Sequence, residues 1–177
     1  MLQAEKWSID SAIKDAKSIT AQWNPSNLDL IDGVKVKEVK NVIKNNGFLT
    51  EIYRQDWELD NLTVDQIFQV SLLPGGISAW HAHEVTTDRI FVNTGLIKVV
   101  LYDARPESPT YGQINEFRCG AFRPMLIIVP PRIWHGVQNF TNEHAALLNI
   151  VDRAYQYDDP DHWRIPVNSP EIPYTFS

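Results

Sequence analysis

The chain has 177 residues, of which 44% are hydrophobic and 11% aromatic, enough apolar side chains for the core of one folded domain. Its net charge of −6 and the lack of any run of Lys or Arg argue against nucleic acid or an anionic membrane as the main partner. The longest apolar runs are too short to span a membrane, and the first residues lack a signal-peptide core. We therefore expect a soluble, cytoplasmic protein with a small-molecule ligand.

Residues 8–20 predict one short amphipathic helix. Ser8 or Asp10 is suited to cap it, and its apolar residues recur at helical spacing: Ile9, Ala12, Ile13, Ala16 and Ile19. Residues 21–33 contain Asn-Pro and Asp-Gly pairs that favour turns, so residues 1–33 are expected to form a helix and a connector. We expect the helix to pack on the main domain or on a partner subunit.

From Val34 onward, short apolar or alternating runs such as VKVKEV, IFQVSLL and LIKVVLYD are separated by Gly, Pro, Asn and Asp clusters. This pattern predicts an all-β fold, and we expect a double-sheet jelly-roll barrel whose two sheets span residues 34–155. The Pro-rich end of the chain predicts an irregular strap with one helical turn near residues 159–163. Residues 34–177 are thus expected to form a barrel with a C-terminal strap.

Four potential metal ligands occur at suggestive positions. His81 and His83 are two residues apart, so their side chains leave the same face of a strand, and Asp88 follows after a turn-forming stretch. His135 follows a Pro-Pro pair further along the chain. Three imidazoles and one carboxylate suit a divalent metal such as Zn, Mn, Fe or Ni. The alternative is that the histidines hold no metal and are tied to carboxylates.

These spacings resemble the two motifs of the cupin superfamily. Residues 75–95 match the first motif, with Asp88 where Glu is usual, and residues 130–139 match the second, with Arg132 where Gly is usual. A closer resemblance, over roughly residues 45–175, is to the dTDP-4-dehydrorhamnose 3,5-epimerase family. It is carried by the segments Gly47–Glu51, Asp103–Arg105, Ser108–Gln113, Pro130–Gly136 and Asp152 with Tyr155.

The resemblance implies a metal-free sugar epimerase in which His81 is the base and His135 and Asp103 belong to the active site. It also places Asp152 and Tyr155 at the site, and it implies a homodimer that exchanges N-terminal strands, here residues 34–54.

The chain departs from that family at positions that the reaction uses. The carboxylate that orients the base is absent from residues 167–170, and Leu148-Asn149 stands where the family has a Tyr acid. Ser78 and Asn46 stand where it has phosphate-binding arginines. Low activity on the family's usual substrate is therefore expected.

Several other side chains are candidates for binding a sugar-type ligand. Arginines can grip a carboxylate or phosphate with two hydrogen bonds, and aromatic rings can stack on a sugar. The candidates are Arg89, Arg105, Arg132, Trp80 and Tyr102. The alternatives are that the arginines pair with acidic residues and that the aromatic residues belong to the core.

Three functions remain open from the sequence. The first, which we prefer, is an epimerase-related protein acting on or binding a sugar or nucleotide sugar. The second is a metal-dependent cupin using His81, His83, Asp88 and His135 for dioxygen, isomerase or Lewis-acid chemistry. The third is a carbohydrate-binding module that has kept the fold and lost catalysis.

Overall fold

The computed structural model describes residues 9–23 and 29–177, and nearly all regular structure in that part is β-strand. The elements are β1 (Lys35–Glu38), β2 (Asn41–Lys44), β3 (Gly47–Thr50), the 3-10 turn η1 (Gln55–Trp57), β4 (Gln66–Leu72), β5 (Ile77–Ala82), β6 (Asp88–Thr94), β7 (Leu96–Tyr102), β8 (Ile114–Gly120), β9 (Met125–Val129), β10 (Trp134–Gln138), β11 (Ala145–Val151) and β12 (Trp163–Arg164). The all-β fold predicted from the strand pattern is confirmed.

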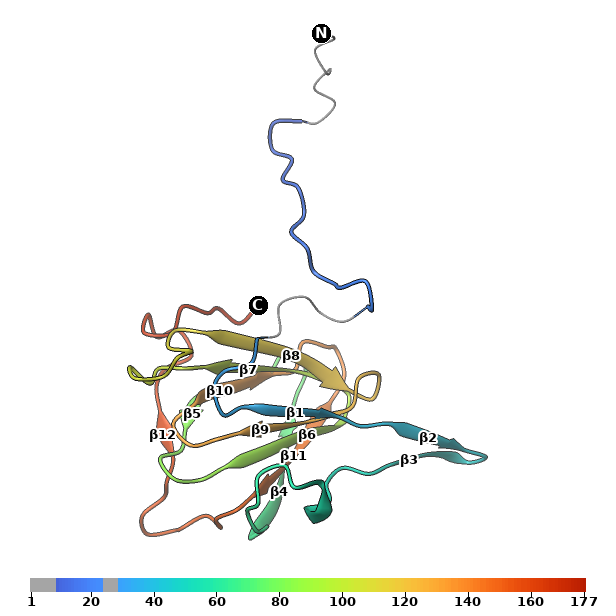
Figure 1. Cartoon of the computed structure of the whole chain (residues 1–177), viewed down its shortest axis with the longest axis vertical. Helices are drawn as coiled ribbons and strands as arrows, with labels where there is room; N and C mark the ends of the chain where they lie inside the picture. Colours follow the sequence, from blue (N-terminus) through green and yellow to red (C-terminus); the bar gives the residue numbers. More distant parts are fainter. Residues whose placement is uncertain (1–8, 24–28) are drawn as a thin grey trace.

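The strands form two five-stranded antiparallel sheets that face each other (Figure 1). The first sheet has the order β1-β9-β6-β11-β4, and the second has the order β12-β5-β10-β7-β8. Strands β2 and β3 form a separate hairpin that projects from the body (Figure 1). Consecutive strands thus alternate between the two sheets over much of the chain, as in a jelly roll.

The main core lies between the two sheets, where Val99, Leu101 and Phe117 of the second sheet meet Ile127 and Leu147 of the first. The outer faces are covered as well. Phe91, Leu126 and Ile128 lie under the segment around Ile52 and Tyr53. This double covering explains why β9 is a continuous apolar run and why β7 is apolar apart from Lys98, rather than alternating.

The predicted N-terminal helix is absent. Residues 9–20 are not helical, and they extend away from the barrel (Figure 1). Ile9 and Ile13 are 75% and 91% exposed, so the apolar face that the sequence suggested has no surface to pack on. A helix of about 12 residues is marginal in water without such packing. Ser8, one proposed cap, lies outside the described residues.

The C-terminal strap contains no helical turn at residues 159–163, which was the second incorrect helical prediction. Instead, Trp163 and Arg164 pair with β5 as strand β12, which adds an edge strand to the second sheet. Beyond it, Tyr174 and Phe176 pack on Trp80 at the outer face of that sheet. Within the described ranges, no helix is long and apolar enough to cross a membrane.

Candidate functional site

A cavity of about 850 Å³ is lined by inner-face residues of both sheets and by residues of the strap. Four of the five histidines of the chain line it: His81, His83, His135 and His162. A lone histidine in a strand is usually structural, but four in one cavity indicate a site for chemistry.

His81 and His135 face each other because of the pairing between β5 and β10. Their Cα atoms are register partners, and their rings lie 4.7 Å apart. The register shifts between His135 and Val137, at Gly136, where an added Cβ would lie only 2.4 Å from the Cβ of Ala79. A glycine is therefore needed for the close approach that keeps the two histidines together.

Asp88 lies at the centre of the site and is almost completely buried. Its Oδ2 lies 3.3 Å from Nε2 of His83 and 3.2 Å from Nε2 of His135. Apart from these two contacts, Oδ2 has no hydrogen-bond partner within the described part of the chain. Its other oxygen, Oδ1, accepts a hydrogen bond of 2.7 Å from the side-chain amide of Asn149.

The backbone contacts of His83 and His135 determine which ring nitrogen carries the proton in the neutral form of each. Nδ1 of His135 contacts the carbonyl of Ile133 at 3.1 Å, and Nδ1 of His83 contacts the carbonyl of Asp161. A carbonyl only accepts, so each Nδ1 is the donor. Each neutral imidazole therefore turns a lone pair on Nε2 toward the carboxylate of Asp88, and each Nε2 requires either a second proton or a metal ion.

The pKa shifts of Asp88 and His83 are consistent with a positive charge being required between the carboxylate and the Nε2 atoms. Burial alone would raise the pKa of Asp88, but the facing imidazoles of His135 and His83 hold it well below its usual range. Burial works against a charge on His83, but Asp88 and the carbonyl of Asp161 raise its pKa. The three ligand atoms of His83, Asp88 and His135 lie within 4.8 Å of one another, which is close enough for one ion to reach all three.

His81 lies beside this triad but does not belong to it. Its Nδ1 is buried and has no hydrogen-bond partner in the described structure, which is consistent with the missing orienting carboxylate. Burial lowers its pKa to about 2, and the nearby His135, His162 and Arg164 lower it in the same direction. His81 is therefore neutral at physiological pH.

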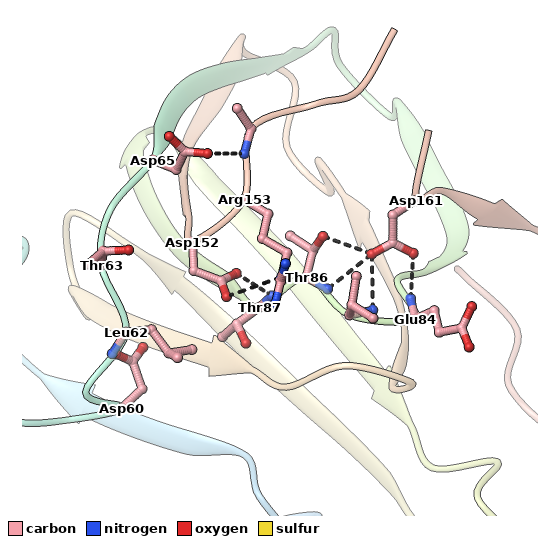
Figure 2. A network of polar contacts seen from close by, with 12 residues as sticks. Asp60, Leu62, Thr63, Asp65, Glu84, Thr86, Thr87, Asp152, Arg153 and Asp161 are labelled. Carbon is pink, nitrogen blue, oxygen red and sulfur yellow. Dashed lines mark hydrogen bonds and ion pairs between the residues drawn. The ribbon is translucent and has the colours of Figure 1, made fainter. Parts of the chain in front are cut away.

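His162 reaches the site from the strap, and its ring lies 5.4 Å from that of His81 and 5.0 Å from that of His83. The preceding residue, Asp161, anchors the strap. Its carboxylate accepts hydrogen bonds from the backbone N–H groups of Glu84, Val85 and Thr86 and from the Thr86 hydroxyl (Figure 2). The strap therefore closes one side of the cavity.

Two further anchors hold the start of the strap. Asp152, expected at the active site, accepts a hydrogen bond from the N–H of Thr87 at 2.7 Å, and Asp65 accepts one from Ala154 (Figure 2). Asp152 is not among the residues that line the cavity, whereas Tyr155 is.

The other residues predicted for substrate binding or catalysis lie away from the cavity. Asp103 is fully buried and binds Arg105, Ser108 and Thr110, where it holds the loop after β7. Arg89 is buried in an ion pair of 2.5 Å with Asp60. These geometries give both residues structural roles.

The aromatic candidates and Arg132 also point elsewhere. Trp80 is completely buried on the outer face of the second sheet. Tyr102 lines a separate hollow of about 320 Å³ with Trp134 and Ile172. The side chain of Arg132 lies 3.7 Å from Glu84, while its N–H bonds the carbonyl of His83. The alternation of residues in a strand predicts which side chains share a face of the sheet. It does not predict that the outer faces are covered by other segments, so residues there were mistaken for ligand-binding ones.

Sequence reasoning missed three residues of the site: Asp161, His162 and Arg164. They lie in the Pro-rich strap, where no motif or regular period marks them. Only the pairing of β12 with β5 brings them to the histidines.

The fold is the jelly roll of the cupins. The sequence profile of the dTDP-4-dehydrorhamnose 3,5-epimerase family matches residues 29–176, and the chain belongs to this family.

Two relatives and one solved structure illustrate the similarity. The chain is 33% identical over 137 residues to the probable low-salt glycan biosynthesis epimerase Agl13 of Haloferax volcanii, covering 77% of this chain and 88% of that protein. It is 34% identical over 151 residues to the spore coat polysaccharide biosynthesis protein SpsL of Bacillus subtilis, covering 84% and 97%. The crystal structure of a dTDP sugar isomerase from Desulfovibrio desulfuricans superposes with a TM-score of 0.76 at 27% identity, covering 82% and 91%.

Proposed function

We propose that the protein binds a nucleotide-linked sugar with a carbonyl group in the cavity between the sheets and moves a proton at a carbon next to that carbonyl. The observation that carries this proposal is His81, a neutral histidine that lines the cavity and whose Nδ1 has no partner among the described residues. Family membership supports the substrate class, because one relative is named as a probable glycan biosynthesis epimerase and one similar solved structure as a dTDP sugar isomerase.

In this reaction the imidazole of His81 accepts the proton from carbon, and the electron pair moves to the carbonyl oxygen to give an enolate. The carbon then takes a proton from solvent at the other face of the sugar, and the imidazole of His81 releases its proton to solvent. Two groups that assist this reaction in the family are missing, because Asn149 binds Asp88 where a Tyr acid is expected and His81 has no carboxylate partner among the described residues. Each such group is worth about 10²–10⁴ in rate, so we expect slow turnover.

The test is proton exchange with solvent. The protein is incubated in D₂O with dTDP-4-dehydro-6-deoxyglucose, and deuterium at the ring carbons next to the carbonyl is followed by NMR. We expect slow incorporation that is lost in His81→Asn and kept in Arg118→Gln, a change at an exposed residue outside the cavity. No incorporation above the protein-free rate would reject the catalytic proposal and favour the non-catalytic sugar-binding function.

A second candidate function is binding of a divalent metal. It is supported by the two Nε2 lone pairs that meet the carboxylate of Asp88, since metal-bound histidines commonly donate their other N–H to a carbonyl. His83, Asp88 and His135 would hold Zn, Mn, Fe or Ni, with Asn149 orienting the carboxylate. Such an ion would supply a Lewis acid for the sugar carbonyl.

Metal content after purification without chelator, and calorimetric titration with Zn²⁺ or Mn²⁺, test this candidate. We expect stoichiometric binding that is abolished in His83→Ala and in His135→Ala but retained in His81→Ala. Binding should weaken at acid pH because the ligand imidazoles must be neutral. Absence of metal both before and after reconstitution would favour a metal-free site in which His83 and His135 are tied to the carboxylate of Asp88.

We also propose a homodimer in the cytoplasm. The β2–β3 hairpin supports the dimer, because it projects from the body (Figure 1). Its apolar side chains Ile43, Phe48 and Leu49 are 76%, 59% and 57% exposed. An apolar hairpin of this kind is stabilised by pairing with a second subunit.

A further inference from the structure

Arg164 lies at the edge of the cavity, immediately beside the proposed base. Strand β12 pairs with β5 so that Arg164 and His81 are register partners, and both residues line the cavity. Arg164 is also exposed, so its guanidinium is accessible to a ligand that enters from solvent. A positive charge is thus built into the same wall as His81.

Among the eight arginines of the chain, Arg164 differs in having no counter-ion in the described structure. The other seven each lie within 4.0 Å of a carboxylate: Arg54, Arg89, Arg105, Arg118, Arg123, Arg132 and Arg153. The protein has 22 acidic residues against 16 basic ones, so carboxylates are not scarce. An arginine left without one beside a cavity is suited to a negatively charged ligand.

The positive charge of Arg164 lies next to the histidines of the cavity, because Arg164 is the register partner of His81 on the neighbouring strand. The two acidic residues nearest along the strap do not offset it, because Asp161 is committed to the loop at residues 84–86 and Asp159 makes no ion pair with it. A ligand at His81 therefore lies within the field of this guanidinium.

We infer that Arg164 binds the diphosphate group of the ligand. The inference rests on the proposed function for the nature of the ligand, and it adds where the phosphates lie. A planar guanidinium can grip two phosphate oxygens at once. With the diphosphate at β12, the attached sugar extends along the cavity past His81 toward His83 and His135. Arg153 lines the cavity too, but it lies 4.0 Å from Asp152 and is a weaker candidate.

Calorimetric titration with dTDP and with inorganic pyrophosphate tests this inference without any need for turnover. We expect Arg164→Gln to weaken the binding of dTDP by about 10- to 100-fold, which corresponds to about 1.4–2.8 kcal/mol. The affinity of Arg164→Lys for dTDP should lie between those of the wild type and Arg164→Gln, because lysine keeps the positive charge but cannot donate two parallel hydrogen bonds. The matched control is Arg118→Gln, an exposed arginine on β8 outside the cavity, which should bind dTDP as the wild type does.

Two outcomes would overturn the inference: equal affinity in Arg164→Gln and wild type, or no binding of dTDP or pyrophosphate to the wild type. Neither outcome depends on proton exchange. Exchange at the sugar with unaltered affinity in Arg164→Gln would leave the proposed function standing and reject the phosphate site. Binding of dTDP that depends on Arg164, without any proton exchange, would support the phosphate site and reject the catalytic proposal. Because Arg164 is exposed and makes no ion pair in the described structure, its replacement should leave thermal unfolding unchanged.

Discussion

Replacement of Asp161 by Ala should loosen the strap that closes the cavity. The carboxylate accepts four hydrogen bonds, with lengths of 2.6, 3.0, 3.0 and 2.8 Å, from residues 84–86. At about 1.5 kcal/mol for each bond to a charged group, simple addition would give about 6 kcal/mol. Glu84 and Val85 are exposed, however, so water replaces part of what is lost. We therefore expect the free energy of unfolding to fall by about 2–4 kcal/mol.

Urea unfolding at pH 7 measures this change, and Asp159→Ala is the matched control because Asp159 is on the same strap and makes no hydrogen bond in the described structure. Burial tends to raise the pKa of Asp161, but the N–H groups of residues 84–86 and the Thr86 hydroxyl lower it overall. Its contribution is thus present above the unfolded-state pKa of about 3.9 and lost as the pH falls below it. Equal stability of Asp161→Ala and Asp159→Ala at pH 7 would refute the reasoning.

Three further predictions concern other parts of the molecule. Phe48→Asp in the β2–β3 hairpin should convert a dimer into a monomer, measured by light scattering; a wild-type monomer at all concentrations would contradict it. Asp103→Asn should lower the free energy of unfolding by about 2–4 kcal/mol at pH 7, because a buried carboxylate loses its bonds to Arg105, Ser108 and Thr110. The pKa of Asp103 is depressed despite burial, so the deficit should shrink as the pH falls below about 4, and a pH-independent deficit would argue against it. Arg132→Gly should unfold at the same or a higher temperature, since Arg132 has a φ of 66°, and a clear loss of stability would show that its side chain matters more than its backbone strain.

The fold was largely predictable because its signals are local. Alternating and apolar runs marked the strands from β1 to β11 with the exception of β2, and turn residues marked the connections. The helix at residues 8–20 failed because amphipathic spacing describes a face without saying whether anything covers it. Ile13, at 91% exposure, shows that nothing in the described ranges covers it. The helical turn predicted in the strap was wrong because a contact distant in sequence determines the structure there. Residues 163–164 form strand β12 because they pair with the edge of β5.

The candidate site was predictable where spacing within one strand determined it. His81 and His83 followed from the period of two residues, and Asp88 and His135 from the motifs. Geometry separated His81 from the other three, because Asp88 lies 3.3 Å from Nε2 of His83 and 3.2 Å from Nε2 of His135, whereas His81 is outside this group in the described structure. Arg164 and His162 could not be found, since their role depends on a contact between segments far apart in sequence. Asp103 and Arg89 misled because a charged residue in a strand can be buried in an ion pair as readily as it can line a cavity.

The pairing of distant strands also sets how this molecule must fold. Strand β1 joins β9, β4 joins β11 and β5 joins β12, and in each pair the partners are about 70 to 90 residues apart in sequence. Closing such loops costs chain entropy before the stabilising contacts between the strands form. We therefore expect folding in about milliseconds to seconds rather than microseconds. The four histidines of the cavity lie on β5, immediately after β5, on β10 and on the strap, so no early, locally folded fragment can contain them all. A cavity able to bind a ligand arises only with the complete barrel.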